Sequence, residues 1–178
     1  MIILGAMLPL LLIFAIAGSS SGSSKTSSSG ATYNLGPVTN LGVVKPPTAI
    51  VTIDNQAAAA SPCNLSPAYL IAQQHYESGY NPNALSPAGA VGLSQFESAT
   101  FASYAQPIPP GGANPPSRKN PIDSAYAEAR MLCADGVNTN PTGAFITYNC
   151  GSTSLICQIA SSSYAANIIG LAKKLTGA

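Results

Sequence analysis

The chain has 178 residues, of which only 7% are charged, and its formal net charge is +1. This length allows one ordinary domain with appendages. No run of Lys and Arg is present, so the composition argues against nucleic-acid binding and against a polybasic membrane-surface site. The single histidine cannot complete a zinc finger, and the four cysteines show no Cys-x-x-Cys spacing, so we expect no metal and no cofactor.

Residues 1–17 contain an apolar stretch from Ile2 to Ala17 that ends in Ala-Ile-Ala, the form of a signal-peptide cleavage site. The stretch is slightly short for a membrane span, and no Lys or Arg precedes it. A cleaved signal peptide and a retained membrane anchor both stay open. Either one exports the rest of the chain into an oxidising compartment, where an even number of cysteines fits disulfide bonds. On counting alone, a Cys–His pair competes with that interpretation.

Residues 18–60 are interpreted as a linker. The first part, residues 18–32, is rich in Ser and Gly, and the second part has few apolar residues. We therefore expect a flexible tether here. The remaining residues, 61–178, are numerous enough to bury one core.

This domain is predicted to be mostly helical. One helix starts at Ser66-Pro67 and stops at Gly79, and another starts at Asn120-Pro121 and ends near Ala134. Further helices are expected at residues 98–105, 141–149 and 163–175. Residues 106–121 contain six prolines among sixteen residues, which predicts a stiff surface loop without helix.

The expected domain contains five carboxylates: Glu77, Glu97, Asp123, Glu128 and Asp135. A general acid that works near neutral pH needs a raised pKa. Asp123 and Glu97 lie at helix starts, which favour the ionised form, Glu128 is expected in the middle of a helix, and Asp135 is expected in solvent beside a glycine. Glu77 lies in the last turn of an apolar helix, where the helix dipole and the uncharged neighbours both favour the protonated form. A surface glutamate at a helix end is the alternative interpretation.

Three segments resemble one family: "YESGYNPNALSPAGAVGLSQFESAT", "NPIDSAYAEARMLC" and "AFITYNCG". Their order and spacing are similar to those of the SLT-type lytic transglycosylases, a branch of the lysozyme-like superfamily. The resemblance covers roughly residues 67–151. It implies a mostly α, lysozyme-like helical domain, preceded by the N-terminal hydrophobic export or anchor segment and the tether. The implied substrate is the glycan strands of peptidoglycan.

The resemblance also implies site residues. Glu77 takes the place of the single catalytic glutamate of the family. The implied substrate-binding residues, which match polar positions of the family motifs, are Ser78, Ser86, Gln95, Tyr148 and Asn149. The sequence departs from the family pattern at Ser94, which replaces a methionine, and at Cys150, which replaces a small residue. We expect the Ser94 replacement to remove an apolar wall of the cleft.

Four cysteines allow three disulfide connectivities, and the sequence does not decide among them. We favour Cys63–Cys133, which would tie the start of the first helix to the end of the second, and Cys150–Cys157, which would close a short loop beside Tyr148 and Asn149.

A lytic transglycosylase cleaves the bond between MurNAc and GlcNAc and leaves 1,6-anhydro-MurNAc ends. A lysozyme-type muramidase, in which Glu97 orients a water molecule, is the enzymatic alternative, and a non-catalytic wall-binding module is the alternative from another class. By family analogy, small enzymes of this kind serve conjugation, secretion or phage assemblies. We expect an exported protein that is periplasmic, cell-wall-associated or anchored in a membrane and facing outward.

Overall fold

The computed structural model describes Tyr33 and residues 35–178 of the chain. This part consists of one 3-10 helix and six α-helices, joined by loops that contain only isolated β-bridges. The elements are η1 (Leu41–Val43), α1 (Thr48–Ala59), α2 (Pro67–Ser78), α3 (Ser98–Tyr104), α4 (Pro121–Ala134), α5 (Pro141–Cys150) and α6 (Leu155–Thr176). The prediction of a mostly helical domain is confirmed for the described residues.

Three helices begin with a capping residue followed by proline, at Ser66-Pro67, Asn120-Pro121 and Asn140-Pro141. In each case the capping side chain accepts hydrogen bonds from backbone N–H groups of the first turn, and proline loses no bond there because its nitrogen needs no partner. α2 stops at Gly79, whose φ of 60° lies in the left-handed region. The starts and the stop predicted for these helices are therefore confirmed.

α1 lies inside the segment that the sequence analysis interpreted as a linker. Ile50, Ala57 and Ala58 of this helix are buried in the core, and α1 packs against α2 and α4. The preceding backbone is also attached to the domain, since the N–H groups of Tyr33 and Thr39 donate to carbonyl oxygens of the C-terminal half. The linker interpretation is thus corrected from Tyr33 onwards, because packing against other helices stabilises a segment with little hydrophobic pattern of its own. Residues 1–17 and 18–32 lie outside the described residues.

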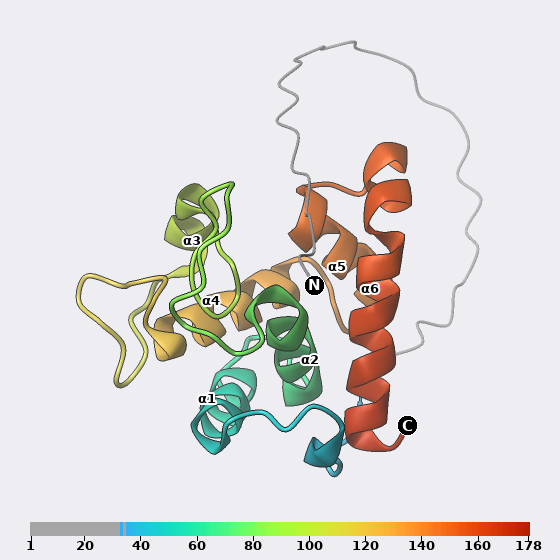
Figure 1. Cartoon of the computed structure of the whole chain (residues 1–178), viewed down its shortest axis with the longest axis horizontal. Coiled ribbons are helices and arrows are strands. Elements are labelled where there is room, and N and C mark those ends of the chain that lie inside the picture. Colours follow the sequence, from blue (N-terminus) through green and yellow to red (C-terminus); the bar gives the residue numbers. More distant parts are fainter. Residues whose placement is uncertain (1–32, 34) are drawn as a thin grey trace. The chain divides into compact units, whose positions relative to one another are not determined.

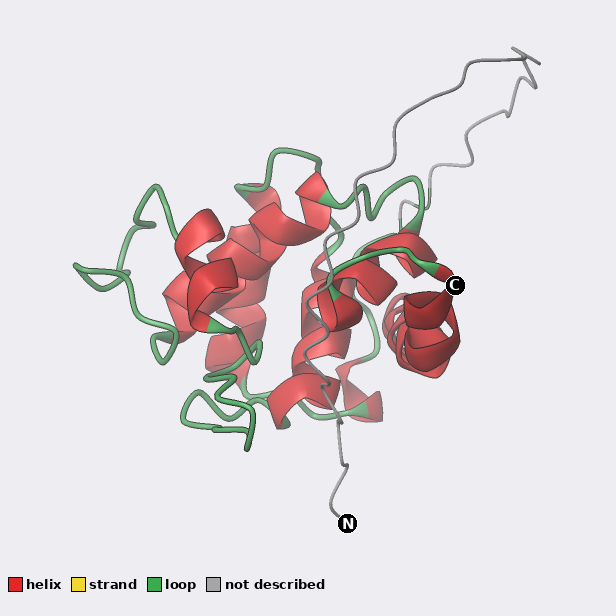
Figure 2. Cartoon of the chain, turned by 90° about the horizontal axis from the view of Figure 1, so that it is seen from above, coloured by secondary structure: helices red, strands yellow, loops and turns green. Residues whose placement is uncertain are grey.

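α2 is the central helix of the domain. It contacts α1 and α4 on one side and α6 on the other, and α5 packs along α6 (Figure 1). α3 packs on α4, away from α6, as the two views agree (Figures 1 and 2). This arrangement places the C-terminal end of α2 between the helices α3 and α4 on one side and α5 and α6 on the other.

α6 starts at Leu155, earlier than the expected start near Ser163. Ser154 caps it by accepting a hydrogen bond from the Cys157 N–H group. By length and composition α6 is apolar enough to cross a membrane, and 33% of its most apolar stretch is buried within the domain. Its buried side, which includes Ile168 and Leu171, faces α2 and α5.

Two disulfide bonds are present, Cys63–Cys133 and Cys150–Cys157, with Cα–Cα distances of 5.5 and 5.6 Å. The first joins the segment before α2 to the end of α4, and the second joins the end of α5 to the start of α6. The pairing favoured from the sequence is the one that the structure contains.

The proline-rich segment between α3 and α4 forms a loop without helix, as predicted. Asp123 in the first turn of α4 organises it, because its carboxylate accepts hydrogen bonds from the backbone N–H groups of Ala113 (3.1 Å) and Ser117 (2.8 Å). Arg130 fixes the start of the same loop by donating to the carbonyl oxygens of Tyr104 and Pro107.

Candidate active site

Glu77 lies in the last turn of α2, and its side chain is partly exposed. Tyr164 of α6 donates a hydrogen bond to its carboxyl group. Gln73, one turn earlier on α2, donates in turn to the Tyr164 hydroxyl (Nε2–Oη 3.2 Å). A chain of three polar side chains therefore holds the carboxyl group of Glu77 between two helices.

The surroundings of Glu77 favour its protonated form. Burial raises the pKa of Glu77 from 4.5 to about 7, and the polar side chains of Tyr164 and Gln73 oppose part of that rise. A carboxyl group with this pKa carries its proton in a large fraction of molecules near neutral pH, which is what a general acid requires. The direction of the shift agrees with the prediction from the sequence, although burial is its main cause.

Two more carboxyl groups have strongly raised pKa values, Asp54 of α1 and Glu128 of α4. Gln74 Nε2 donates to both of them, at 2.9 Å each. Burial raises the pKa of Asp54 to about 8. Burial also raises the pKa of Glu128 well above its usual value, and the negative charges of Asp54 and Glu77 add to that rise. A strongly raised pKa is therefore common to three carboxyl groups here.

Solvent access separates these three groups. Asp54 and Glu128 have no exposed surface, whereas Glu77 is partly exposed. A group that protonates a substrate must lie within hydrogen-bond reach of it. Among the three, only Glu77 is open to solvent, while Asp54 and Glu128 are sealed inside the domain.

The loop between α2 and α3 carries Ser86 and Gln95, and Ser78 at the end of α2 holds that loop. The Ser78 hydroxyl donates to the Leu93 carbonyl oxygen (2.7 Å). The Ser86 hydroxyl accepts from the Ala90 N–H group (3.0 Å). Gln95 has a φ of 48°, and its side chain donates to the Gly92 carbonyl oxygen (2.9 Å). All three residues are partly exposed and have partners within the loop or at its base.

Tyr148 and Asn149 end α5 and connect it to its neighbours. The Tyr148 hydroxyl donates to the Ser94 carbonyl oxygen (2.7 Å), and the Asn149 amide donates to the Ser161 hydroxyl of α6 (2.8 Å). Tyr148 thus bonds to the loop before α3, and its hydroxyl donates to that carbonyl and not to Glu77.

Ser94 does not lie where the sequence analysis expected. It has no exposed surface, and its hydroxyl donates to Glu128 Oε2 (2.6 Å). The expectation that this position forms a wall of the cleft is therefore wrong. A serine fits here because the buried Glu128 carboxyl needs hydrogen-bond donors.

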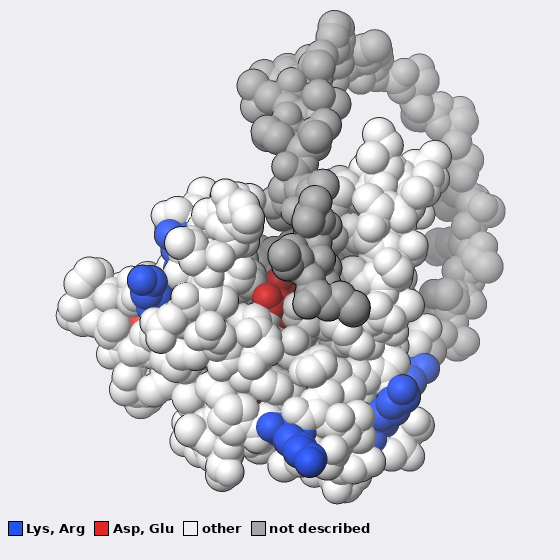
Figure 3. Space-filling model, viewed as in Figure 1, with Lys and Arg blue, Asp and Glu red and all other residues white. Residues whose placement is uncertain are grey.

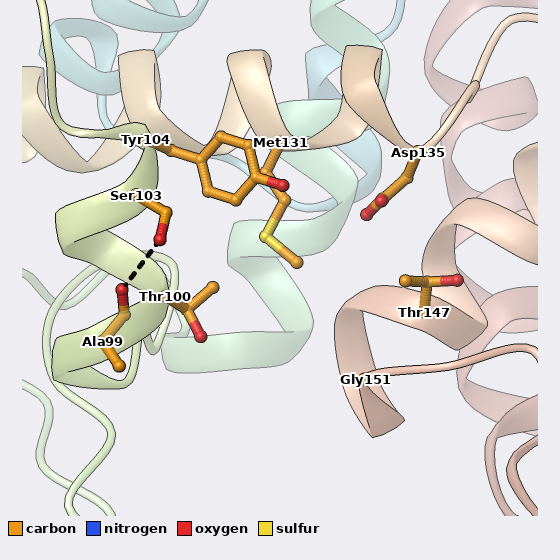
Figure 4. Close-up of a pocket in the computed structure, with 8 residues that line it drawn as sticks. All are labelled: Ala99, Thr100, Ser103, Tyr104, Met131, Asp135, Thr147 and Gly151. Carbon is orange, nitrogen blue, oxygen red and sulfur yellow. Dashed lines mark hydrogen bonds between the residues drawn. The ribbon is translucent and has the colours of Figure 1, made fainter. Parts of the chain in front are cut away.

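A pocket of about 380 Å³ lies between α3, the end of α4 and the end of α5 (Figure 4). Asp135 is one of its lining residues, and one carboxyl oxygen of Asp135 is buried without a hydrogen-bond partner among the described residues. The expectation that Asp135 lies free in solvent is wrong, since it is half-buried and burial raises its pKa. Figure 3 shows acidic side-chain atoms in a recess between the α3 and the α5–α6 parts of the domain.

The sequence analysis missed two polar residues of this region, Gln73 and Tyr164, and it did not predict that Glu128 is buried. Tyr164 lies on the apolar face of α6 together with Ile168 and Leu171. A tyrosine in such a stripe carries a hydroxyl that needs a buried partner, and this signal points to a polar group across the helix interface. Among the described residues, no group of three or more His, Cys, Asp and Glu side chains is placed to hold a metal ion.

A model of the transglycosylase SLT domain family matches residues 54–168, which run from α1 into α6. The chain therefore belongs to the transglycosylase SLT family, whose members are lytic transglycosylases, glycan-cleaving lyases that act on peptidoglycan. No curated protein and no solved structure matches the chain. Because peptidoglycan lies outside the cytoplasmic membrane, a domain of this family acts outside the cytoplasm.

Proposed function

We propose that the protein cleaves the MurNAc–GlcNAc bonds of peptidoglycan with Glu77 as its single acid and base, and that it leaves 1,6-anhydro-MurNAc ends. The observation that carries this proposal is the state of Glu77, which combines partial exposure with a pKa raised to about 7. The other carboxyl groups near it with strongly raised pKa values are sealed from solvent.

In the first step, protonated Glu77 donates its proton to the glycosidic oxygen, and the bond from that oxygen to the anomeric carbon of MurNAc breaks. In the second step, the ionised Glu77 takes the proton of the MurNAc 6-hydroxyl, whose oxygen attacks the same anomeric carbon. The new bond closes the anhydro ring, and Glu77 regains its proton. No water molecule is consumed. Because Glu77 has its proton back, it is ready for the next cycle.

One carboxyl group suffices because the nucleophile belongs to the substrate. Glycosidases that use water or an enzyme nucleophile need a second carboxylate. An intramolecular hydroxyl has an effective molarity on the order of 10⁵ M or more in well-oriented cases. Proton transfer by one positioned carboxyl group adds about 10²–10⁴-fold.

Tyr164 supports the ionised state of Glu77 and orients its carboxyl group. Its hydroxyl donates to the carboxyl group and thereby stabilises the ionised form that exists between the two steps. The same hydrogen bond fixes the direction in which the carboxyl group points. We place Ser78, Ser86, Gln95, Tyr148 and Asn149 along the substrate groove, and their partial exposure supports this placement.

The N-terminal residues fit an exported enzyme. We propose that residues 1–17 export or anchor the protein and that residues 18–32, rich in Ser and Gly, tether the domain. A tether of this composition lets a periplasmic or wall-associated enzyme reach glycan strands from a membrane or from a conjugation, secretion or phage assembly. The support for this is the sequence composition and the extracytoplasmic substrate of the family.

The test compares Glu77→Gln with Glu97→Gln on purified peptidoglycan, with mass spectrometry of the released muropeptides. Glu97 is exposed at the start of α3 and is the water-orienting residue of the hydrolytic alternative. We expect E77Q to lose release by about 10²–10⁴-fold while it still binds glycan, and wild type to release anhydro ends. Reducing ends that disappear in E97Q would establish hydrolysis. Unchanged release by E77Q would overturn the proposal.

A further inference from the structure

The pocket between α3, α4 and α5 has two kinds of wall. Tyr104 and Met131 line it with apolar surface, and the hydroxyl-bearing residues Thr100 and Thr147 lie at its edge (Figure 4). The side chains of Thr100 and Thr147 form no hydrogen bond within the described residues, in contrast to Ser103, whose hydroxyl donates to the Ala99 carbonyl oxygen (3.2 Å). The pocket therefore offers apolar contact together with free hydrogen-bonding groups.

Asp135 adds a carboxyl group to this pocket. It follows α4 as the C-terminal capping residue, and its side chain points from the α4 end into the space beside Met131 (Figure 4). One of its oxygens is buried and unpaired. The nearest basic side chain on the same helix, Arg130, is engaged by the carbonyl oxygens of Tyr104 and Pro107. Within the described part of the chain, no basic side chain offsets the cost of burying this carboxyl group, and burial makes the group harder to ionise.

A pocket with one carboxyl group and apolar walls selects its ligand by charge and shape. An anion is repelled by the carboxylate. A primary ammonium on a chain of methylene groups fits both walls, because the methylenes pack on Met131 and Tyr104 and the ammonium reaches Asp135. The hydroxyls of Thr100 and Thr147 accept the remaining N–H bonds, and the ring of Tyr104 attracts the cation. A volume of about 380 Å³ accommodates one such side chain.

The pocket adjoins the expected substrate groove. Met131 and Tyr104 pack in one cluster with Phe96 and Tyr148, the residues that flank Gln95 and Asn149 in the sequence. Thr147 and Gly151 of the pocket likewise flank the Tyr148-Asn149 pair on α5. A ligand in the pocket therefore lies beside the residues that we place along the glycan.

We propose that this pocket binds the free side-chain ammonium of a diamino acid in the peptide stems of peptidoglycan, so that Asp135 gives the enzyme a preference for strands whose stems carry a free amine. This inference rests on the proposed function, since it assigns a second part of the same substrate to the same groove. It makes Asp135 a specificity-determining residue that takes no part in the proton transfers of Glu77.

The test uses the full chain and two matched substrates, peptidoglycan with free stem amines and the same material with those amines acetylated. Wild type is expected to lose about 10-fold in kcat/KM on the acetylated substrate, and Asp135→Asn is expected to act on both substrates at the same low rate. Ser103→Ala, in the same pocket wall but with an internally bonded hydroxyl, keeps the wild-type preference. Equal rates of wild type on the two substrates would overturn the proposal. The proposal would also be overturned if D135N lost as much kcat/KM on glycan strands without peptides. That result would assign the pocket to a sugar.

A second measurement needs neither a variant nor turnover. Nα-acetyl-lysine amide is titrated into the wild-type protein, and its Nε-acetylated form serves as the control. Chemical-shift changes at Asp135 and Met131 with the free amine alone support the proposal, and equal or absent changes overturn it. Because this is a binding readout, it separates the pocket from Glu77: an active E77Q enzyme would end the proposed mechanism and leave the binding result standing.

Discussion

The hydroxyl of Ser94 donates a hydrogen bond to the buried carboxyl group of Glu128 at 2.6 Å, and this bond joins the loop before α3 to the middle of α4. The backbone carbonyl of the same serine accepts a hydrogen bond from Tyr148 of α5. The next residue, Gln95, has a φ of 48°, a left-handed conformation that is costly for a residue with a side chain. Contacts from two helices thus hold a strained turn in place.

Replacing Ser94 by Ala is expected to destabilise the domain by about 1–3 kcal/mol, because the Glu128 carboxyl then keeps Gln74 as its remaining donor. Ser124→Ala is the comparison variant: the Ser124 hydroxyl donates to the Ser94 hydroxyl (2.9 Å), accepts from the Ser94 N–H group (3.3 Å) and does not bond to the carboxyl group, so its loss is expected to cost about 1 kcal/mol. Urea unfolding of the two variants measures the difference. A loss for S94A no larger than that for S124A contradicts the role assigned to the Ser94–Glu128 bond.

Replacing Tyr164 by Phe is expected to raise the pKa of Glu77 above about 7, because the lost hydrogen bond is one that lowers it. The proposed first step requires protonated Glu77, so the alkaline limb of the kcat/KM profile is expected to move to higher pH. Tyr148→Phe is the control, since its hydroxyl bonds to Ser94 instead, and it leaves the limb in place. A limb that stays still or moves to lower pH in Y164F would show that this hydroxyl does not act on Glu77.

Local signals in the sequence predicted the helices whose ends are marked by capping residues, proline or glycine. Ser66-Pro67 and Asn120-Pro121 predict helix starts, and Gly79 predicts a stop, because each acts within one turn of chain. The position of Glu77 at the end of an apolar helix follows from the same signals. These features could be predicted because they depend on neighbours in the sequence.

The segment around α1 could not be predicted in this way. Its helix carries no side-chain cap, and its stability depends on burying Ile50 and Ala57 against other helices. The hydrogen-bond partners of the buried carboxyl groups could not be predicted either, since Asp54, Gln74 and Glu128 come from three different helices. Long-range contacts of this kind leave no periodic pattern in a single sequence.

The stability of the domain is expected to fall as pH rises from about 4 to about 8. Asp54 has a folded-state pKa of about 8 against 3.8 for an ordinary aspartate, so in this range the unfolded chain holds fewer protons than the folded one. The stabilising proton is fully present below about pH 4 and is lost as pH passes through about 8. One such group gives a slope of at most about 1.4 kcal/mol per pH unit. Glu128, whose pKa is also raised, adds to the slope in the same direction.

Asp54→Asn removes one titrating group and keeps its size, so urea unfolding from about pH 5 to about pH 9 is expected to show a shallower decline than in wild type. The variant gains stability relative to wild type at the alkaline end, where Asp54 would be ionised and buried. A decline with the same slope in both proteins means that Asp54 does not take up its proton on folding.

Two glycines of the loop before α3 allow the cost of backbone strain to be measured separately from the cost of a steric clash. Gly89 and Gly92 both have a φ of +87°, so alanine at either position adopts a left-handed conformation that costs about 1–2 kcal/mol. A Cβ atom at Gly89 meets nothing within 4 Å, whereas at Gly92 it lies 1.9 Å from the backbone oxygen of Arg118. That backbone cannot move freely, because the Arg118 side chain donates to the carbonyl oxygens of Gly89 and Phe96.

We therefore expect Gly89→Ala to cost about 1–2 kcal/mol and Gly92→Ala to cost about 3 kcal/mol or more, as strain and overpacking add. G92A also displaces the turn that presents Gln95, so its kcat/KM falls further than that of G89A when both are compared at a temperature where each is folded. Thermal unfolding and glycan release from the same preparations measure the two effects. Equal stability losses in the two variants would show that the Arg118 backbone yields to a side chain at position 92, and that the close approach of Gly92 does not fix this loop.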